Sequence, residues 1–168
     1  MISLSYVQLM AAYNAEMNRR VYAAAGRLDD AARREDRGAF WHSIHGTLSH
    51  LVWGDRMWMS RFAGWTPPPV AVSESDALFA VFEDMAAARA EDDRKIEAWA
   101  AELDEAWLEG DLTWFSGAAG RAMTKPRALL VMHFFNHQTH HRGQAHAMLT
   151  AAGETTGATD IPMIFAGY

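Results

Sequence analysis

The chain has 168 residues, no cysteine and a formal net charge of −6, from 15 basic and 21 acidic residues. This length suits one domain over residues 1–168, and the apolar half of the composition excludes a disordered chain. The acidic balance argues against nucleic acid as a partner, because phosphate backbones attract basic surfaces. Without cysteine, disulfides and protein thiolates are excluded, so a metal site would need histidine, carboxylate or water as ligands.

The sequence also lacks membrane and export signals. No uncharged apolar stretch reaches the roughly 18 residues that a membrane-spanning helix needs, so no membrane partner is expected. The N-terminal segment has neither the basic start nor the small-residue cleavage site of a signal peptide. We therefore expect a cytoplasmic protein.

Four stretches show the three-and-four spacing of apolar residues that is typical of long helices. They cover residues 4–25, about 40–61, about 75–103, and 126 to about 152. The polar segment 29–37 predicts a solvated loop with one helical turn, and the three prolines at 67–69 predict an extended connector. The charged run 91–95 is interpreted as a solvated helix face.

Short strand-like runs over residues 112–115 and 121–124 surround a turn-forming segment, which predicts a β-hairpin. Together with the four helices, this indicates an all-α protein: an antiparallel four-helix bundle with a small β-hairpin before the last helix. The turn-rich tail after Gly153 is expected to fold back over the bundle or over a partner subunit.

Five of the eight histidines lie in the last predicted helix. His137 and His141 are four residues apart, so their side chains leave the same face of that helix, one turn above the other. Two such imidazoles can share a metal ion, which then needs a third ligand from elsewhere. The alternative is a pair of hydrogen-bonded core histidines.

His50 lies in the middle of the second predicted helix, with Gly46 and Gly54 four residues before and after it. Interior glycines cost about 1 kcal/mol each relative to alanine, and they leave room where a ligand or another backbone comes close. A metal or substrate beside His50 would explain them, and so would close helix packing. His42 and His45 are expected to face solvent or to cap the helix start.

The segments Asn136–Gln144 (NHQTHHRGQ) and Thr47–Trp58 (TLSHLVWGDRMW) resemble the signature of the DinB/YfiT-like superfamily of metal-dependent proteins. The length, the hairpin and the Asp160-Ile161-Pro162 tail extend this resemblance over essentially the whole chain. It implies an up-down-down-up four-helix bundle, often a homodimer, that binds a divalent metal ion, commonly nickel or zinc. Matched position by position, the metal ligands are His50, His137 and His141.

The resemblance implies a divalent-metal-dependent enzyme acting on an unknown small-molecule substrate, either a transferase that uses a low-molecular-weight thiol or a hydrolase. Gln144, His133 and His140 lie on or beside the metal face and are candidates for catalytic roles, whereas Arg142 points about 140° away and is expected in a structural ion pair. A di-iron site and a zincin protease are disfavoured, since Glu-x-x-His and His-Glu-x-x-His motifs are missing.

The alternative hypothesis is a non-catalytic, stress-related dimeric bundle that binds metal or a hydrophobic ligand. In that case the tryptophan- and methionine-rich second helix would form the interface. An open coordination position on the metal beside a pocket would favour the enzyme hypothesis over this binding-module hypothesis.

Overall fold

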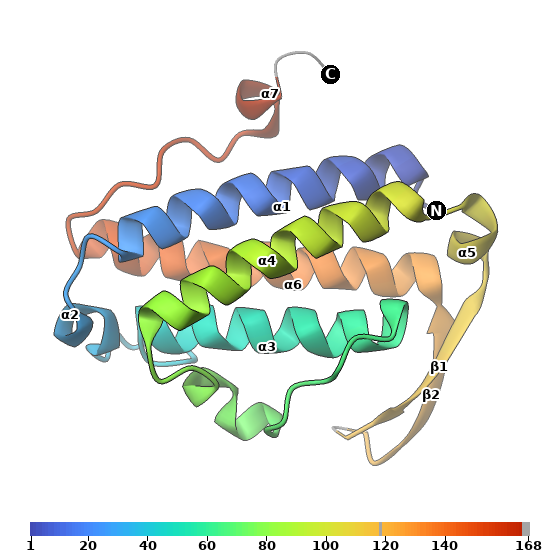
Figure 1. The fold of residues 1–168 in the computed structure, drawn as a ribbon, viewed down its shortest axis with the longest axis horizontal. Helices are drawn as coiled ribbons and strands as arrows, with labels where there is room; N and C mark the ends of the chain where they lie inside the picture. Colours follow the sequence, from blue (N-terminus) through green and yellow to red (C-terminus); the bar gives the residue numbers. More distant parts are fainter. Residues whose placement is uncertain (118, 166–168) are drawn as a thin grey trace.

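Four long helices make up most of the fold (Figure 1). The structure is a computed structural model that describes residues 1–117 and 119–165. The long helices are α1 (Leu4–Ala25), α3 (Ile44–Ala63), α4 (Phe82–Glu102) and α6 (Arg127–Ala151). The predicted all-α class, with a two-stranded antiparallel sheet as its one β element in this part of the chain, is confirmed.

Shorter elements connect the long helices. They are α2 (Asp30–Arg34), the 3-10 helix η1 (Val72–Ala77), α5 (Glu105–Glu109), β1 (Asp111–Ser116), β2 (Arg121–Pro126) and α7 (Ile161–Ile164). The predicted hairpin is confirmed, with Thr113 opposite Thr124 and Trp114 opposite Met123. The single helical turn predicted after Asp29 is α2, which begins where the Asp29 carboxylate accepts a hydrogen bond from the Ala32 amide.

The second predicted helix starts later than expected. It begins at Ile44 because the Ser43 hydroxyl caps it by accepting a hydrogen bond from the Gly46 amide at 3.0 Å. The preceding residues form a tight turn instead, in which Ala39 bridges to His42 and His42 has a positive φ of 61°. His42 is exposed, as predicted. The same prediction for His45 is wrong, because His45 is buried.

The third predicted helix is two elements. Residues 72–77 form η1, and α4 begins only at Phe82. Ser73 and Asp76 have the spacing of a capping box, but η1 begins after Ala71 without a side-chain cap. The Nε2 atom of His45 lies 2.8 Å from the Phe79 carbonyl and holds the connection between η1 and α4 against α3.

The apolar core consists of two clusters at opposite ends of the long helices. One joins the end of α1, the start of α3, the start of α4 and the end of α6. The other joins the start of α1, the end of α3, the end of α4 and the start of α6. In both, α1 packs against α4 and α6, and α3 packs against α6 and α4.

A layer of buried charges separates these two clusters. Arg89 of α4 pairs with Asp55 of α3 and with Asp93 one turn along its own helix. Asp93 also accepts a 2.9 Å hydrogen bond from the Asn18 side chain of α1. Buried carboxylates and guanidinium groups are retained at low cost only when they are paired in this way.

The interpretation of residues 91–95 as a solvated face is therefore wrong in part. Glu91, Arg94 and Lys95 do form exposed ion pairs. Asp92 and Asp93, however, are buried, and Asp92 pairs with Arg56 of α3 at 2.6 Å. Consecutive helical residues point in different directions, so half of a charged run can face a neighbouring helix.

No helix within the described part of the chain is long and apolar enough to cross a membrane.

Replacing Arg89 with leucine would strand Asp55 and Asp93 in the core without their cation. We expect the free energy of unfolding to fall by about 3–5 kcal/mol, as measured by urea unfolding. Arg94→Leu is the matched control, since Arg94 is 71% exposed; it should change stability by less than about 0.5 kcal/mol. Equal effects of the two substitutions would contradict the role of the buried layer.

Candidate metal centre

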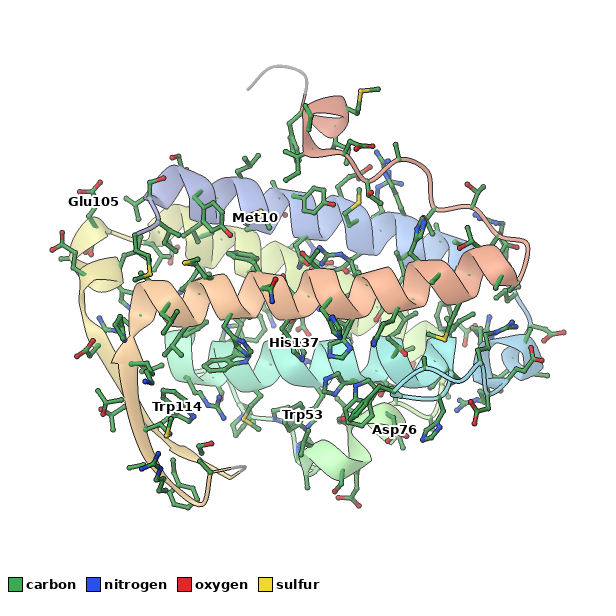
Figure 2. The ribbon with its side chains drawn as sticks, turned by 180° about the vertical axis from the view of Figure 1, so that it is seen from behind. Met10, Trp53, Asp76, Glu105, Trp114 and His137 are labelled. Atoms are coloured by element: carbon green, nitrogen blue, oxygen red, sulfur yellow. The ribbon has the colours of Figure 1, made fainter. Side chains whose placement is uncertain are left out.

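Three histidines from two helices meet in one place. His50 of α3 and His137 and His141 of α6 each offer a nitrogen, and these nitrogens lie within 4.8 Å of one another. The Nε2 atoms of His50 and His137 are 3.2 Å apart. Figure 2 shows His137 pointing from α6 toward α3. The residues singled out in the sequence are thus brought together.

The spacing fits a small divalent cation. Nitrogen ligands at about 2.05 Å in a tetrahedral arrangement are separated by about 3.4 Å. The 3.2 Å between His50 and His137 is close to this value, and the wider limit for the group requires only a small movement of one ring. The group contains three histidines and no carboxylate, so the donor set is neutral.

The ring of His50 is oriented by η1. Its Nδ1 atom lies 2.8 Å from the Ser75 hydroxyl, which itself donates to the Val72 carbonyl at 2.7 Å. Since that hydroxyl proton is already used, Ser75 accepts from His50 Nδ1–H. The lone pair of His50 then lies on Nε2, the atom that faces His137.

The ring of His141 is oriented by Gln144, three residues further along α6. Its Nδ1 atom lies 2.8 Å from the Gln144 side-chain oxygen, which can only accept. His141 therefore carries its proton on Nδ1 and presents the Nε2 lone pair. Gln144 was predicted as a candidate for a catalytic role, and in the structure its side-chain oxygen accepts the hydrogen bond that orients His141.

His137 approaches α3 where that helix has no side chain. A Cβ atom built on Gly54 would lie 2.8 Å from His137 Cε1, closer than real contacts allow. The His137 Nδ1 atom is buried and has no hydrogen-bond partner in the described residues. His137 therefore lacks the Nδ1 partner that orients the rings of His50 and His141.

Gly46 serves the same site from the other side. A Cβ atom there would lie 2.5 Å from the Trp41 carbonyl oxygen, so the glycine admits the turn that carries Trp41. The Trp41 ring stacks on His50 at 4.1 Å between centroids, and Trp53 lies on that ring's flank at 5.9 Å. Gly46 and Gly54 thus allow close packing, and the groups that pack against them, Trp41 and His137, both lie beside His50.

Other aromatic groups extend from the three histidines toward the hairpin. His133 lies one turn before His137, at 6.0 Å between ring centroids, and packs edge-on against Trp58 at 5.2 Å. Trp114 of β1 contacts Trp58 in turn, and the guanidinium of Arg61 lies over the Trp58 ring at 4.6 Å. Figure 2 shows Trp114 on the hairpin beside α3 and α6.

The two exposed candidates flank the centre without joining it. His133 and His140 are both solvent-exposed, and the His140 ring lies 4.9 Å from that of His141. The Nε2 atom of His140 is 3.4 Å from the Gln144 side-chain nitrogen. Neither belongs to the group of three converging nitrogens.

Burial keeps the converging imidazoles neutral. Burial and, to a lesser degree, the neighbouring His141 lower the pKa values of His50 and His137 to about 3. Burial also lowers the pKa of His141, although its bond to Gln144 opposes this. A neutral imidazole is the form that binds a metal ion, so protons compete weakly for this site near pH 7.

The opposite side of the same helix turns carries the buried charge layer. Gln138 follows His137 and is buried, as is Asp55, while Arg142 follows His141. Arg142 was expected in a structural ion pair, but its hydrogen bond goes to the neutral side chain of Asn14.

Sequence analysis missed Ser75 and Trp41 as parts of the site. Both lie outside the helix that carries His50, and only the fold brings them to its ring. Ser75 gave a misleading signal, because its position suggested a helix start.

A sequence model of the DinB family matches residues 2–166. The chain belongs to the DinB family. No curated protein and no solved structure matches it significantly. The matched range includes all three converging histidines of this DinB protein, together with Ser75 and Gln144, which orient two of them.

Adding a methyl group at Gly54 should damage the centre. Gly54→Ala is expected to lower the free energy of unfolding by about 1–3 kcal/mol, because the methyl collides with His137. Gly143→Ala is the matched control, because a Cβ atom at Gly143 would meet nothing within 4 Å. This substitution should be neutral or stabilise α6 by up to about 1 kcal/mol. Chemical unfolding measures both, and a Gly54→Ala protein as stable as Gly143→Ala would contradict this geometry.

The depressed histidine pKa values predict a pH-dependent contribution to stability. Below the ordinary pKa of 6.5 the unfolded chain binds protons that folded His50 and His137 refuse until about pH 3. Their contribution is therefore present above pH 6.5 and is lost as the pH falls toward 3, by at most about 1.4 kcal/mol per group and pH unit.

Burial raises the pKa values of Asp55 and Asp93, which titrate with the opposite sign. The histidine contribution must therefore be isolated as the difference between the metal-free protein and its His50→Phe variant, in urea unfolding at pH 7.5 and 5.0. The wild type should lose more stability than the variant. His42→Phe, at an exposed site, is the control and should behave like the wild type.

Proposed function

We propose that this DinB protein is a divalent-metal-dependent enzyme whose metal ligands are the Nε2 atoms of His50, His137 and His141. The observation that carries the proposal is the convergence of three neutral nitrogens within 4.8 Å. Ser75 and Gln144 give two of the rings the tautomer that a metal ion requires. Membership of the DinB family supports the same conclusion.

The donor set favours a strongly polarising ion. Three uncharged ligands leave the full double charge of nickel or zinc, and a three-histidine set leaves a position open for another ligand. When bound, such an ion supplies a Lewis acid that favours the deprotonated form of a water or thiol. If the nucleophile that attacks the substrate is a low-molecular-weight thiol, the enzyme is a transferase. If the nucleophile is water, the enzyme is a hydrolase. The thiol would come from a cofactor, since the chain has no cysteine.

The chain's own residues have separate roles in this proposal. His50, His137 and His141 hold the ion, and Ser75 and Gln144 orient two of them. His140 and His133 are exposed beside the centre and are the candidates for moving a proton to or from a small-molecule substrate. Gln144 becomes a positioning residue.

The alternative is a non-catalytic, stress-related bundle that uses its tryptophan-rich helix as a dimer interface. The packing of that helix disfavours it: Trp53 donates to the Val70 carbonyl at 2.9 Å, and Trp58 packs against Phe62, Trp114 and His133 of the same chain. Both tryptophan rings therefore already make contacts within one protomer.

The architecture that accompanies the proposal is one domain over residues 1–168 with up-down-down-up helix order. The two apolar clusters support this order, because the starts of α1 and α6 share one cluster with the ends of α3 and α4. A homodimer, a cytoplasmic location and the absence of nucleic-acid partners belong to the same proposal.

Metal analysis of untagged protein tests the ligand set. We expect about one divalent ion per chain in the wild type, and almost none in His50→Ala or in the double variant His137→Ala/His141→Ala. His42→Ala, which alters an exposed histidine outside the group, should keep the wild-type content. Unchanged metal in the double variant would refute the site, and loss of metal in the His42 control would point to nonspecific effects.

A further inference from the structure

A second candidate site lies on the opposite face of α6 from the metal centre. A cavity of about 190 Å³ is lined there by residues of α1, α6 and the segment after α6. Thr139, Arg142, Gly143 and His146 recur at three and four along α6, and they lie about 140–240° around the helix from His137. The cavity is thus separate from the group of three histidines.

The segment that follows α6 covers one side of this cavity. It runs back along α1 in Figure 1. The hydroxyl of Tyr13 donates to the Thr159 carbonyl at 2.8 Å, and Arg20 donates to the Ala158 carbonyl at 3.0 Å. His146 of α6 contacts the hydroxyl of Thr156. These bonds hold the wall in place.

Arg142 is a buried cation that faces this cavity. It is only 6% exposed, and its one hydrogen bond to the described residues goes to the neutral side chain of Asn14. The two buried carboxylates nearby, Asp55 and Asp93, are both paired with Arg89. A guanidinium has five N–H donors, so Arg142 retains donors without a carboxylate partner.

The remaining lining favours an anion with a short apolar part. None of the ten lining residues is acidic, and Met17 and Val21 of α1 provide an apolar side. Gly143 leaves the cavity unobstructed, since a Cβ atom there would meet nothing within 4 Å. An interior helical glycine costs about 1 kcal/mol relative to alanine, and no contact with residues 1–117 or 119–165 requires a glycine here.

We propose that this cavity binds a small aliphatic carboxylate, whose carboxylate group pairs with Arg142 and whose chain packs against Met17 and Val21. A guanidinium and a carboxylate match in shape and form paired, charge-assisted hydrogen bonds. The volume limits the ligand to a short chain. Binding at this face would leave the metal centre free.

Butyrate is the probe, added to the full-length protein as purified and supplemented with zinc, and followed by nitrogen–proton correlation spectra. We expect saturable shifts of the Arg142 side chain and of the backbone at Thr139, Gly143 and Thr156. Butyramide has the same shape without the charge, and it should bind at least about tenfold more weakly, because it cannot form the ionic hydrogen bonds.

Two substitutions at one position serve as a matched pair. Gly143→Leu should fill the cavity and remove the butyrate shifts, whereas Gly143→Ala should keep them with at most a small change in affinity. Neither alters the buried charge layer, so both should fold. Arg142→Met should also abolish binding, with its own spectrum reporting whether the fold survives.

Three outcomes would overturn the proposal. One is no saturable shift with butyrate. Another is equal binding of butyrate and butyramide, which would show an apolar hollow without recognition of charge. The last is a set of shifts confined to Gly54, His137 and their neighbours and unaffected by Gly143→Leu, which would place the carboxylate on the metal instead.

Discussion

The pairing of Arg89 with Asp55 and Asp93 is the interaction on which the helix register depends. It lies between two apolar clusters, either of which could tolerate some sliding of one helix along another. A displaced register would leave buried charges unpaired, which is far more costly than a displaced leucine. Asp55 directly follows Gly54, so the same pairing sets the height at which α3 presents its bare backbone to His137. The ion pair of Asp55 with Arg89 thus helps to fix the position of Gly54 relative to His137.

Much of the site was readable from local periodicity. A spacing of four residues places His137 and His141 on one helix face whatever surrounds the helix, and Gly46 and Gly54 indicated a close approach on either side of His50. The predicted helix over residues 4–25, taken from its apolar spacing, is confirmed as α1. These features depend on residues near one another in the sequence.

What the sequence did not reveal depends on contacts between distant segments. Ser75 reads as a helix-start residue, yet its hydroxyl is held by the Val72 carbonyl and turned toward His50. Asp92 and Asp93 sit in a run that resembles a solvent-facing surface, and only the neighbouring α3 and α1 supply the partners that bury them. A pattern of charges gives the direction of each side chain around its own helix, but it does not say which face the next helix covers.

The surroundings of the three histidines explain why a neutral donor set suits a metal ion here. Trp41 and Trp53 cover the His50 ring, so the centre is poorly hydrated on that side, and charges interact more strongly in such surroundings than in water. Charged imidazoles would repel one another there, whereas neutral ones turn three lone pairs toward a common point. A doubly charged ion at that point would face no carboxylate from the cluster, so its excess charge would be neutralised by what enters from solvent. In the proposed metal centre, an anionic ligand from solvent would therefore be favoured, because the three histidines supply no negative charge.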